Sequence, residues 1–440
     1  MQTCISYFFI FVPLLMRNIM KKIKILFLFV ILISSFDYRI AGLNYWDEAL
    51  IVVGPLYYIL ATKRICIKRK QLKIWLTLIV LIAIGLFSNA LHPEFQSKSI
   101  AIVKDIIAIV KFPLLTTVML NTRTPVKQNS ITHEAAMVSK ILLYIMFCVA
   151  LIGYFVNIGV YQDEVRFVRC YKFFFSHPTF LVSSIIMMIA VLLADGIRRN
   201  RRELLIAGVL IFLSGRTKGY IMIAILLLVV VIKPAVIKNA FANLSGRVKL
   251  KKSYLIFGGV CVSLIVYVLG KNKVIDYMGW GLTAARPALY IVGLYLLKDC
   301  FPLGSGFGTF ASSISGEYYS SVYSKYHISD VNGLIQGHTN YIADTFPPYI
   351  YGQFGIAGAI TYILLLLQLI KYQFKRIKSY DKVIGFLFLW IYIFVACSAE
   401  SFLTNASGAQ AAVVLAVYVG FDSDRTSEAN IQYTRRKNEN

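Results

Sequence analysis

Two cations lie between two short apolar runs, where they could bind an anion. The run Leu213-Ser214-Gly215-Arg216-Thr217-Lys218 separates these apolar segments, so Arg216 and Lys218 are expected at the outer mouth of a helical hairpin. A charge at membrane depth is costly and usually faces a bundle interior or a wet cavity. A guanidinium there can bind a phosphate through paired hydrogen bonds. The alternative is that these side chains extend to lipid headgroups, and the residues alone favour neither interpretation.

A third cation, Arg286, begins the run Arg286-Pro287-Ala288-Leu289-Tyr290 and precedes the glycine-rich run from Pro302 to Gly308. The alternating glycines Gly304 and Gly306 would let the backbone approach a ligand closely or form tight turns. Ordinary turns explain such spacing more often than a ligand site does.

A histidine that could act as a base lies directly before a long apolar segment. His338 begins the run His338-Thr339-Asn340-Tyr341, and its ordinary pKa of about 6.5 suits a general base. An interfacial hydrogen bond is the competing role. Four of the five histidines fall in segments expected outside the membrane, which favours function: His92, His177, His327 and His338.

Three further charged residues, Lys104, Asp105 and Lys111, lie within one apolar segment. Lys104 and Lys111 are seven positions apart and therefore share a helix face. We expect the three to pair with one another inside the bundle, and a contact to a lipid pyrophosphate is the bolder alternative.

The elements that position these residues are membrane helices. Of the 440 residues, 58% are hydrophobic and 15% are charged, whereas soluble domains carry about 25% charge. Apolar runs long enough to cross a bilayer as helices, about 20 residues, recur along the chain. Because they leave no room for a sizeable soluble domain, we expect a single all-α membrane domain over residues 1–440.

The net charge of +25 indicates membrane topology rather than nucleic-acid binding. Lys and Arg number 46 against 21 Asp and Glu, and the basic residues lie between the apolar runs. Positive charge marks cytoplasmic loops. The clusters expected inside are Lys21 to Lys24, Lys63 to Lys73, Arg123 with Lys127, Arg198 to Arg202, Lys233 to Lys252, Lys371 to Lys382 and Arg425 to Lys437.

About twelve spans satisfy this charge pattern, with both termini cytoplasmic and the chain in a bacterial inner membrane. The run after Lys21 to Lys24 is expected to be the first span rather than a cleaved signal, and residues 1–19 an upstream extension. The expected spans are 24–36, 48–62, 74–91, 100–120, 138–160, 179–195, 203–215, 217–232, 253–270, 347–370, 383–397 and 406–421.

Two long segments are expected outside the membrane. Residues 161–178 are dense in charge and aromatic rings, with Arg166, Arg169 and Lys172 among them. Residues 271–346 form a large periplasmic loop. Loops of that length are uncommon unless functional or disordered, and the aromatic and apolar pieces of this one predict short helices lying against the membrane.

Several classes of protein lack support in the sequence. It contains no phosphate-binding loop, HExxH or GxSxG motif, and its seven cysteines have no metal-ligand spacing. Cys170 and Cys300 both fall outside, which allows a disulfide. Asp330 and Asp344 are isolated, so no external carboxylate pair indicates glycoside hydrolysis.

Taken together, these runs resemble the O-antigen ligase and polymerase superfamily of bacterial surface-glycan assembly. The matching pieces follow the superfamily's order and span most of residues 20–420. They are Phe175 to Leu181, Ser214 to Thr217, Arg286, Pro302 to Gly308, His338 to Tyr341, and Gly352 with Gly355 to Gly358.

The resemblance implies a GT-C-like fold and a metal-independent, inverting glycosyltransferase without a cofactor. Its donor would be an oligosaccharide on undecaprenyl pyrophosphate. Arg216 and Arg286 would stabilise the leaving group, and His338 would orient or deprotonate the acceptor hydroxyl. Substrate contacts are expected from Arg166, Arg169, Lys172, His177, Lys218, Tyr290, Gly304, Gly306, Asn340 and Tyr341.

Further partners implied are membrane lipids, a chain-length regulator and a flippase. The superfamily includes polymerases, which join lipid-linked repeat units, and ligases, which transfer the finished chain to lipid A core. The cationic residues Arg166, Arg169 and Lys172 favour a polymerase slightly, because they suit an anionic growing chain. A flippase is the alternative of a different class, but such transporters often place polar residues at the midplane, where this chain has few.

Overall fold

The computed structural model describes residues 27–28, 30–32, 45–62, 69–121, 128–165, 168–231, 275–276, 278–377 and 379–419. These residues are mostly helical. Five helices are long and apolar enough to cross a membrane, as expected for a helical membrane protein. They are Gln71–Leu91, Ser130–Phe155, Pro178–Asp195, Pro347–Phe374 and Tyr380–Cys397.

The long helices follow the apolar runs of the sequence. The first half of the chain contains α3 (Trp46–Thr62), α4 (Arg69–Leu91), α5 (Ser99–Asn121), α6 (Gln128–Phe155), α7 (Pro178–Asp195), α8 (Arg201–Leu213) and α9 (Thr217–Val231). The C-terminal part contains α15 (Pro347–Phe374), α16 (Tyr380–Cys397) and α17 (Ala406–Val419).

These ten helices coincide with ten of the twelve expected spans, while the number of true membrane crossings stays a prediction. Expected span 253–270 lies outside the described residues, and span 24–36 lies mostly outside them. The expected span 138–160 was misplaced, because α6 begins at Gln128 and ends at Phe155. Polar residues such as His133 and Glu134 continue the helix beyond its apolar part, and Gly159 adopts a positive φ of 73° in the loop that follows.

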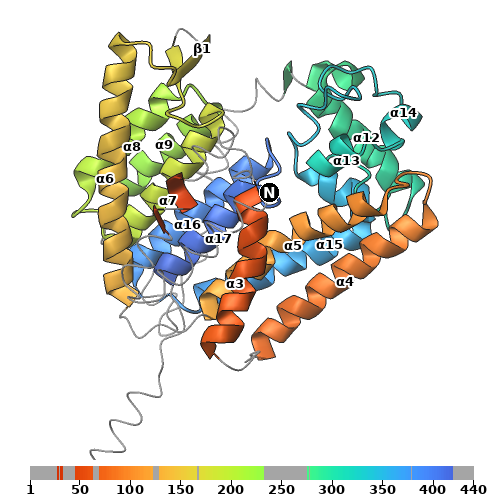
Figure 1. Ribbon diagram of the computed structural model, residues 1–440, viewed down its shortest axis with the longest axis horizontal. Coiled ribbons are helices and arrows are strands. Elements are labelled where there is room, and N and C mark those ends of the chain that lie inside the picture. Colours follow the sequence, from red (N-terminus) through yellow and green to blue (C-terminus); the bar gives the residue numbers. More distant parts are fainter. Residues whose placement is uncertain are drawn as a thin grey trace, which may run out of the picture.

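Helix α7 lies at the centre of one half of the molecule. It packs against α6, α8, α16 and α17, and its residues from Leu181 to Ala194 are buried. Figure 1 shows α6, α8 and α9 on one side and α4, α5 and α15 on the other, with α16 and α17 between them. On that other side α15 packs along both α4 and α12 (Ala285–Asp299).

The chain departs from an all-α fold between α6 and α7. Strands β1 (Tyr161–Val165) and β2 (Val168–Tyr171) form an antiparallel hairpin in the segment expected outside. The Tyr171 hydroxyl donates to the Met146 carbonyl at 2.7 Å, and the Lys172 amide donates to the Val160 carbonyl at 2.9 Å. These bonds fix the hairpin on the end of α6, directly before the first turn of α7.

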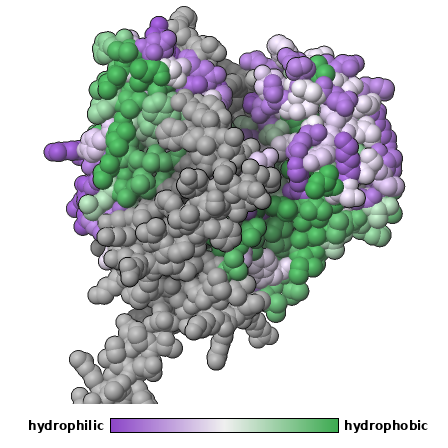
Figure 2. All heavy atoms as spheres, viewed as in Figure 1, coloured by the Kyte–Doolittle hydropathy of each residue, from purple (hydrophilic) through white to green (hydrophobic). Residues whose placement is uncertain are grey.

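The large loop contains short helices, as the sequence predicted. They are η3 (Gly281–Thr283), α12, α13 (Ser313–Glu317) and α14 (Val322–Lys325). Figure 2 shows hydrophilic residues gathered over α12–α14, with hydrophobic residues over α4 below and over α6 at the opposite edge. This separation of polar and apolar surface is the pattern expected of a loop region lying outside the bilayer.

The glycine-rich run from Pro302 to Gly308 forms backbone hydrogen bonds with α15 where that helix is interrupted. Gly355 has φ 62° and ψ −163°, a conformation that interrupts the helix and frees backbone groups. The Ser305 and Gly306 amides donate to the carbonyls of Gly352 and Gln353 at 3.0 and 2.8 Å, and the Ala357 amide donates to the Pro302 carbonyl at 3.2 Å. The loop thus supplies hydrogen bonds that the broken helix lacks.

Candidate anion-binding site

His177 is positioned by the proline that begins α7. Because a residue before proline favours extended backbone, His177 lies at the N-cap with φ −146° and ψ 145°. Its half-buried ring lies beside the first turn of α7, with its Nδ1 3.3 Å from the Thr179 amide.

Arg216 is positioned by a left-handed glycine. Gly215 has φ 69°, which lets the chain leave α8 and enter α9 within three residues. The Arg216 Nη2 donates to the Nε2 of His177 at 2.9 Å. Its buried Nε has no hydrogen-bond partner among the described residues, and no carboxylate in the described chain lies within salt-bridge distance of it. The guanidinium therefore keeps donor capacity for an anion.

Lys218, in the first turn of α9, forms a nearly buried ion pair. Its Nζ donates to Glu400 Oε1 at 2.6 Å, and the two side chains are 11% and 12% exposed. Glu400 follows the C-terminal end of α16, so this ion pair joins two helices that are far apart in the sequence.

Arg286 forms a second ion pair, at the start of α12. Its Nη2 donates to Asp344 Oδ2 at 2.9 Å. Burial raises the pKa of the Asp344 carboxyl, and Arg286 acts in the opposite direction. Asp344 therefore has a cationic partner, which the sequence did not indicate. Tyr290, one turn along α12, donates from its hydroxyl to the Ser398 carbonyl at 3.4 Å.

The backbone joins these ion pairs into one site. The Phe346 amide donates to the Cys397 carbonyl at 3.2 Å, and the Ser401 amide donates to the Ala343 carbonyl at 3.0 Å. These bonds clamp the loop that carries Asp344 against the turn that carries Glu400. Lys218 in turn lies within electrostatic range of both Arg216 and Arg286.

Three helices begin at this site, which reinforces its preference for an anion. Pro178, Thr217 and Ala285 are the first residues of α7, α9 and α12. The N-terminal end of a helix carries a positive partial charge and unpaired backbone N–H groups. The site combines these ends with three cationic side chains and two carboxylates, so its net charge is positive.

His177 is held neutral by its surroundings. Burial, followed by the positive charges of Arg216, Lys218 and Lys172, lowers its pKa to about 4. Its Nδ1 lies 3.3 Å from the Thr179 amide and its Nε2 2.9 Å from Arg216. A neutral imidazole has one acceptor nitrogen. The shorter contact, from a guanidinium that can only donate, favours Nε2 as the acceptor.

The histidine expected to act as a base lies elsewhere in the large loop. His338 is exposed, and no hydrogen bond or ion pair in the described chain joins it to Arg216 or Arg286. Its amide donates to the Ile335 carbonyl at 2.8 Å in a tight turn. Asn340 and Tyr341 follow on the same exposed stretch.

Gly304 and Gly306 are both buried and are accounted for by packing within the protein. A Cβ at Gly304 would come within 2.4 Å of the Gly355 nitrogen, and one at Gly306 within 2.6 Å of the Asn89 side chain. The two glycines lie against α15 and α4 and do not join the cationic site. We therefore leave them out of the site proposed below.

Lys104, Asp105 and Lys111 do not pair with one another, contrary to expectation. Lys104 pairs with Glu317 at 2.6 Å, and Lys111 pairs with Asp47 and Glu48 of α3. The Asp105 Oδ2 accepts from the Gly308 amide at 2.8 Å. Each charge instead joins α5 to a different neighbouring segment. Lys104 and Lys111 share a helix face but lie about 10 Å apart along the axis, and Asp105 projects about 100° away from Lys104.

The remaining expected residues lie in or beside the hairpin, except for one outside the described residues. Lys172 follows β2 and lies within electrostatic range of His177. Arg169 is exposed on β2, and Arg166 lies outside the described residues. Neither Cys170 nor Cys300 forms a disulfide, so the bridge that the sequence allowed is not made. The described residues contain no cluster of His, Cys, Asp and Glu suited to a metal ion.

The sequence interpretation missed Glu400 and did not assign Asp344 a partner. Glu400 lies in the run Ser398-Ala399-Glu400-Ser401, a polar break between two apolar segments. A lone acid at the outer end of a span was a usable signal, because such a charge needs a partner.

The chain matches no known protein-family model, and no curated protein is significantly similar to it.

Proposed function

We propose that this protein is a surface-polysaccharide polymerase of a bacterial inner membrane. It would transfer a glycan from undecaprenyl pyrophosphate to an acceptor sugar hydroxyl at the periplasmic face. The proposal rests on the site formed by Arg216, Lys218 and Arg286 at the start of two helices, beside His177 at the start of a third.

The reaction is a displacement at the anomeric carbon of the donor. The acceptor oxygen forms a bond to that carbon while the bond from the carbon to the pyrophosphate oxygen breaks, with inversion. Negative charge then develops on the lipid pyrophosphate. Fixed cations placed where charge develops lower the barrier. Arg216 and Arg286 fill this role, and the Arg216 Nε has no hydrogen-bond partner among the described residues.

The acceptor hydroxyl must also lose its proton, and His338 is the residue we assign to this step. Its side chain is exposed in the large loop, so a sugar hydroxyl can reach it. It lies only six positions before Asp344, so their Cα atoms are at most about 21 Å apart. Closure of this loop over a bound acceptor would bring base and leaving-group site together.

The hairpin is the observation that favours a polymerase over a ligase. Lys172 leads from β2 to the site and lies within electrostatic range of His177, with Arg169 exposed on the strand before it. Lys172, a cation at the end of the hairpin beside the leaving-group site, suits an anionic growing chain that stays lipid-linked.

The first test is the surface-polysaccharide ladder of a deletion strain complemented with variants. We expect Arg216→Ala, Arg286→Ala and His338→Ala to leave core carrying a single repeat unit. The matched control is Arg202→Ala, an exposed arginine at the start of α8, which should restore the full ladder. Loss of the single-unit band with accumulation of lipid-linked polymer would identify a ligase instead. A normal ladder from all three variants would overturn the site.

A second test separates the enzyme from a flippase. Purified protein in detergent is supplied with lipid-linked repeat units, and the products are resolved by gel electrophoresis. A polymerase elongates them without ATP or another membrane protein. Protein that is folded but never elongates these units, and never glycosylates lipid A core, would refute the proposed activity.

A further inference from the structure

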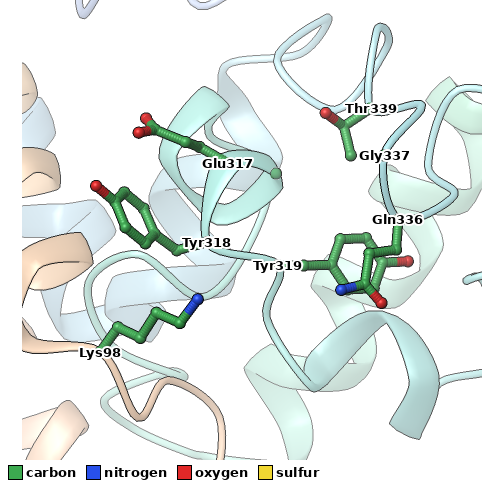
Figure 3. Close-up of a pocket in the computed structure, with 8 residues that line it drawn as sticks. Lys98, Glu317, Tyr318, Tyr319, Gln336, Gly337 and Thr339 are labelled. Atoms are coloured by element: carbon green, nitrogen blue, oxygen red, sulfur yellow. The ribbon is translucent and has the colours of Figure 1, made fainter.

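A polar pocket of about 410 Å³ lies in the large loop, separate from the cationic site. Figure 3 shows its walls: Lys98, Glu317 and Tyr318 lie on one side, and Tyr319, Gln336 and Thr339 on the other. The pocket thus combines the loop before α5, the end of α13 and the turn that carries His338. None of its residues belongs to the sequence motifs except Thr339.

Contacts within the protein orient three of the side chains that line the pocket, Lys98, Tyr319 and Glu317. The Tyr319 hydroxyl donates to the Leu334 carbonyl at 2.7 Å, which fixes its ring. Glu317 is oriented by its ion pair with Lys104 at 2.6 Å. The Lys98 and Lys104 ammonium groups lie 5.5 and 4.8 Å from the centre of the Tyr318 ring. A pocket whose walls are fixed in advance costs little free energy to order on binding.

The chemistry of the walls suits a sugar. A pyranose ring has an apolar face of C–H groups and an edge of hydroxyls that both donate and accept. Tyr318 and Tyr319 offer aromatic faces for the first. Glu317 offers acceptors, Lys98 offers donors, and Gln336 and Thr339 offer both, which meets the second. A lipid tail would leave these polar groups without partners.

The charge of the pocket argues against a pyrophosphate there. Lys104 is neutralised by Glu317, so Lys98 is the one excess cation among the lining residues, which also include no arginine. The cationic site described above offers far more positive charge for the donor's pyrophosphate. The pocket and the cationic site therefore suit different parts of the substrates.

The position of the pocket relates it to the acceptor. Its lining residues Gly337 and Thr339 flank His338 directly in the sequence, so the turn that carries the proposed base forms part of the pocket wall. Thr339 and Asp344 are five residues apart, and their Cα atoms are therefore at most about 18 Å apart. A short oligosaccharide held in the pocket can span that distance and present its terminal sugar near the ion pair of Asp344 and Arg286.

We propose that this pocket binds the acceptor saccharide, through stacking on Tyr318 and Tyr319 and hydrogen bonds to Glu317, Gln336 and Thr339. The assignment of this saccharide as the acceptor rests on the proposed polymerase function. The binding of a saccharide itself is independent of that function and can be measured without turnover.

The test uses short oligosaccharides cleaved from the host's purified surface polysaccharide, free of lipid. Their binding to the full-length protein in detergent is followed by saturation-transfer NMR. We expect Tyr318→Ala and Gln336→Ala each to weaken binding about tenfold, a loss of about 1.4 kcal/mol, because each removes a contact to the saccharide. Gln336 is exposed, so its variant should fold normally. The matched control Ser324→Ala, exposed on α14 outside the pocket, should bind as the wild type does.

The elongation assay separates failure of this inference from failure of the polymerase proposal. In the pocket variants the acceptor KM should rise about tenfold while kcat changes by less than about threefold. Arg216→Ala should still bind the free oligosaccharide although it elongates nothing. If the wild type bound the oligosaccharide but did not elongate it, the saccharide site would stand and the polymerase proposal would be refuted. Elongation with unchanged KM in Tyr318→Ala and Gln336→Ala would refute the pocket.

Discussion

At the scale of single residues, the charge of the cationic site depends on which of its cations have a carboxylate partner. Lys218 and Arg286 each have a carboxylate partner, whereas the partner of Arg216 is the uncharged ring of His177. A protonated His177 could not accept from a guanidinium and would add a fourth positive charge. The low pKa of His177 therefore keeps this contact intact over the physiological pH range.

This arrangement predicts a pH dependence of stability. The pKa of His177 is about 4 in the folded protein against an ordinary 6.5. Between these values the unfolded chain takes up a proton that the folded protein does not, so the free energy of unfolding falls as the pH drops from about 6.5 to about 4. The substitution His177→Gln keeps an acceptor for Arg216 and removes the titration. We expect its melting temperature in detergent to depend less steeply on pH across this window.

The control for this measurement is His327→Gln, because His327 is exposed in the large loop. Its pH profile should match that of the wild type. If His177→Gln retained the full slope of the wild type below about pH 6.5, other groups would be responsible for the acid sensitivity.

The ion pair of Lys218 and Glu400 predicts strong coupling between two residues. Breaking a buried pair by removing one partner costs about 3–5 kcal/mol, because the other charge stays buried alone. We expect Lys218→Met and Glu400→Gln each to lower thermal stability markedly, and the double variant to lose less than their sum. A double-mutant cycle from detergent unfolding measures the coupling. Strict additivity would show that the pair carries no net interaction.

At the scale of elements, the break in α15 positions the large loop. The loop from Pro302 to Gly308 and the broken turn at Gly355 exchange backbone hydrogen bonds. Gln353 extends this contact, because its amide accepts from the Gly308 amide at 3.1 Å and donates to the Phe310 carbonyl at 2.6 Å. Two glycine motifs that look like ligand-binding sequences therefore join a membrane helix to the external loop.

The junction predicts that Gly355→Ala is severely destabilising. A Cβ there would come within 2.3 Å of the Pro302 carbonyl oxygen, and the φ of 62° with ψ of −163° is nearly exclusive to glycine. The strain alone costs about 1–3 kcal/mol. The matched control is Gly208→Ala in α8, where nothing lies within 4 Å of the added atom and alanine favours the helix by about 1 kcal/mol.

Fluorescence-detected gel filtration of the two variants tests this prediction. Gly208→Ala should elute as a single peak with unchanged or raised melting temperature, and Gly355→Ala should aggregate or melt at lower temperature. Equal behaviour of the two would mean that α15 can accommodate a side chain at the break.

At the same scale, physical reasons explain which elements and residues could be predicted from the sequence and which could not. The helices were predictable because apolar runs must satisfy their own backbone in lipid. Arg216, Lys218 and Arg286 were predictable because cations at the ends of such runs are rare. Glu400 was not recognised as a partner, since its contact with Lys218 joins positions 182 apart. The role of Gly304 depended on its neighbours in space, which spacing alone does not give.

At the scale of the whole molecule, we predict that the polar surface over α12–α14 and the basic cluster around α8 lie on opposite sides of the membrane. Figure 2 shows the hydrophilic residues of the large loop above the apolar surface of α4. Arg198 to Arg202 run from the turn after α7 into the first turn of α8, at the end of α7 remote from His177. Since positive loops stay in the cytoplasm, we expect this end to be inside and His177 with the cationic site to be outside.

Cysteine labelling tests this topology directly. In a Cys148→Ala background, which removes the exposed cysteine of α6, a membrane-impermeant maleimide is applied to cells whose outer membrane alone is permeable. Ser324→Cys on α14 should be labelled, and Arg202→Cys should react only after the inner membrane is lysed. Because donor pyrophosphate, acceptor pocket and hairpin all require the same outer face, the reverse pattern would refute the topology and the proposed reaction together. Labelling as expected would leave the chemistry to be decided by the ladder and elongation assays.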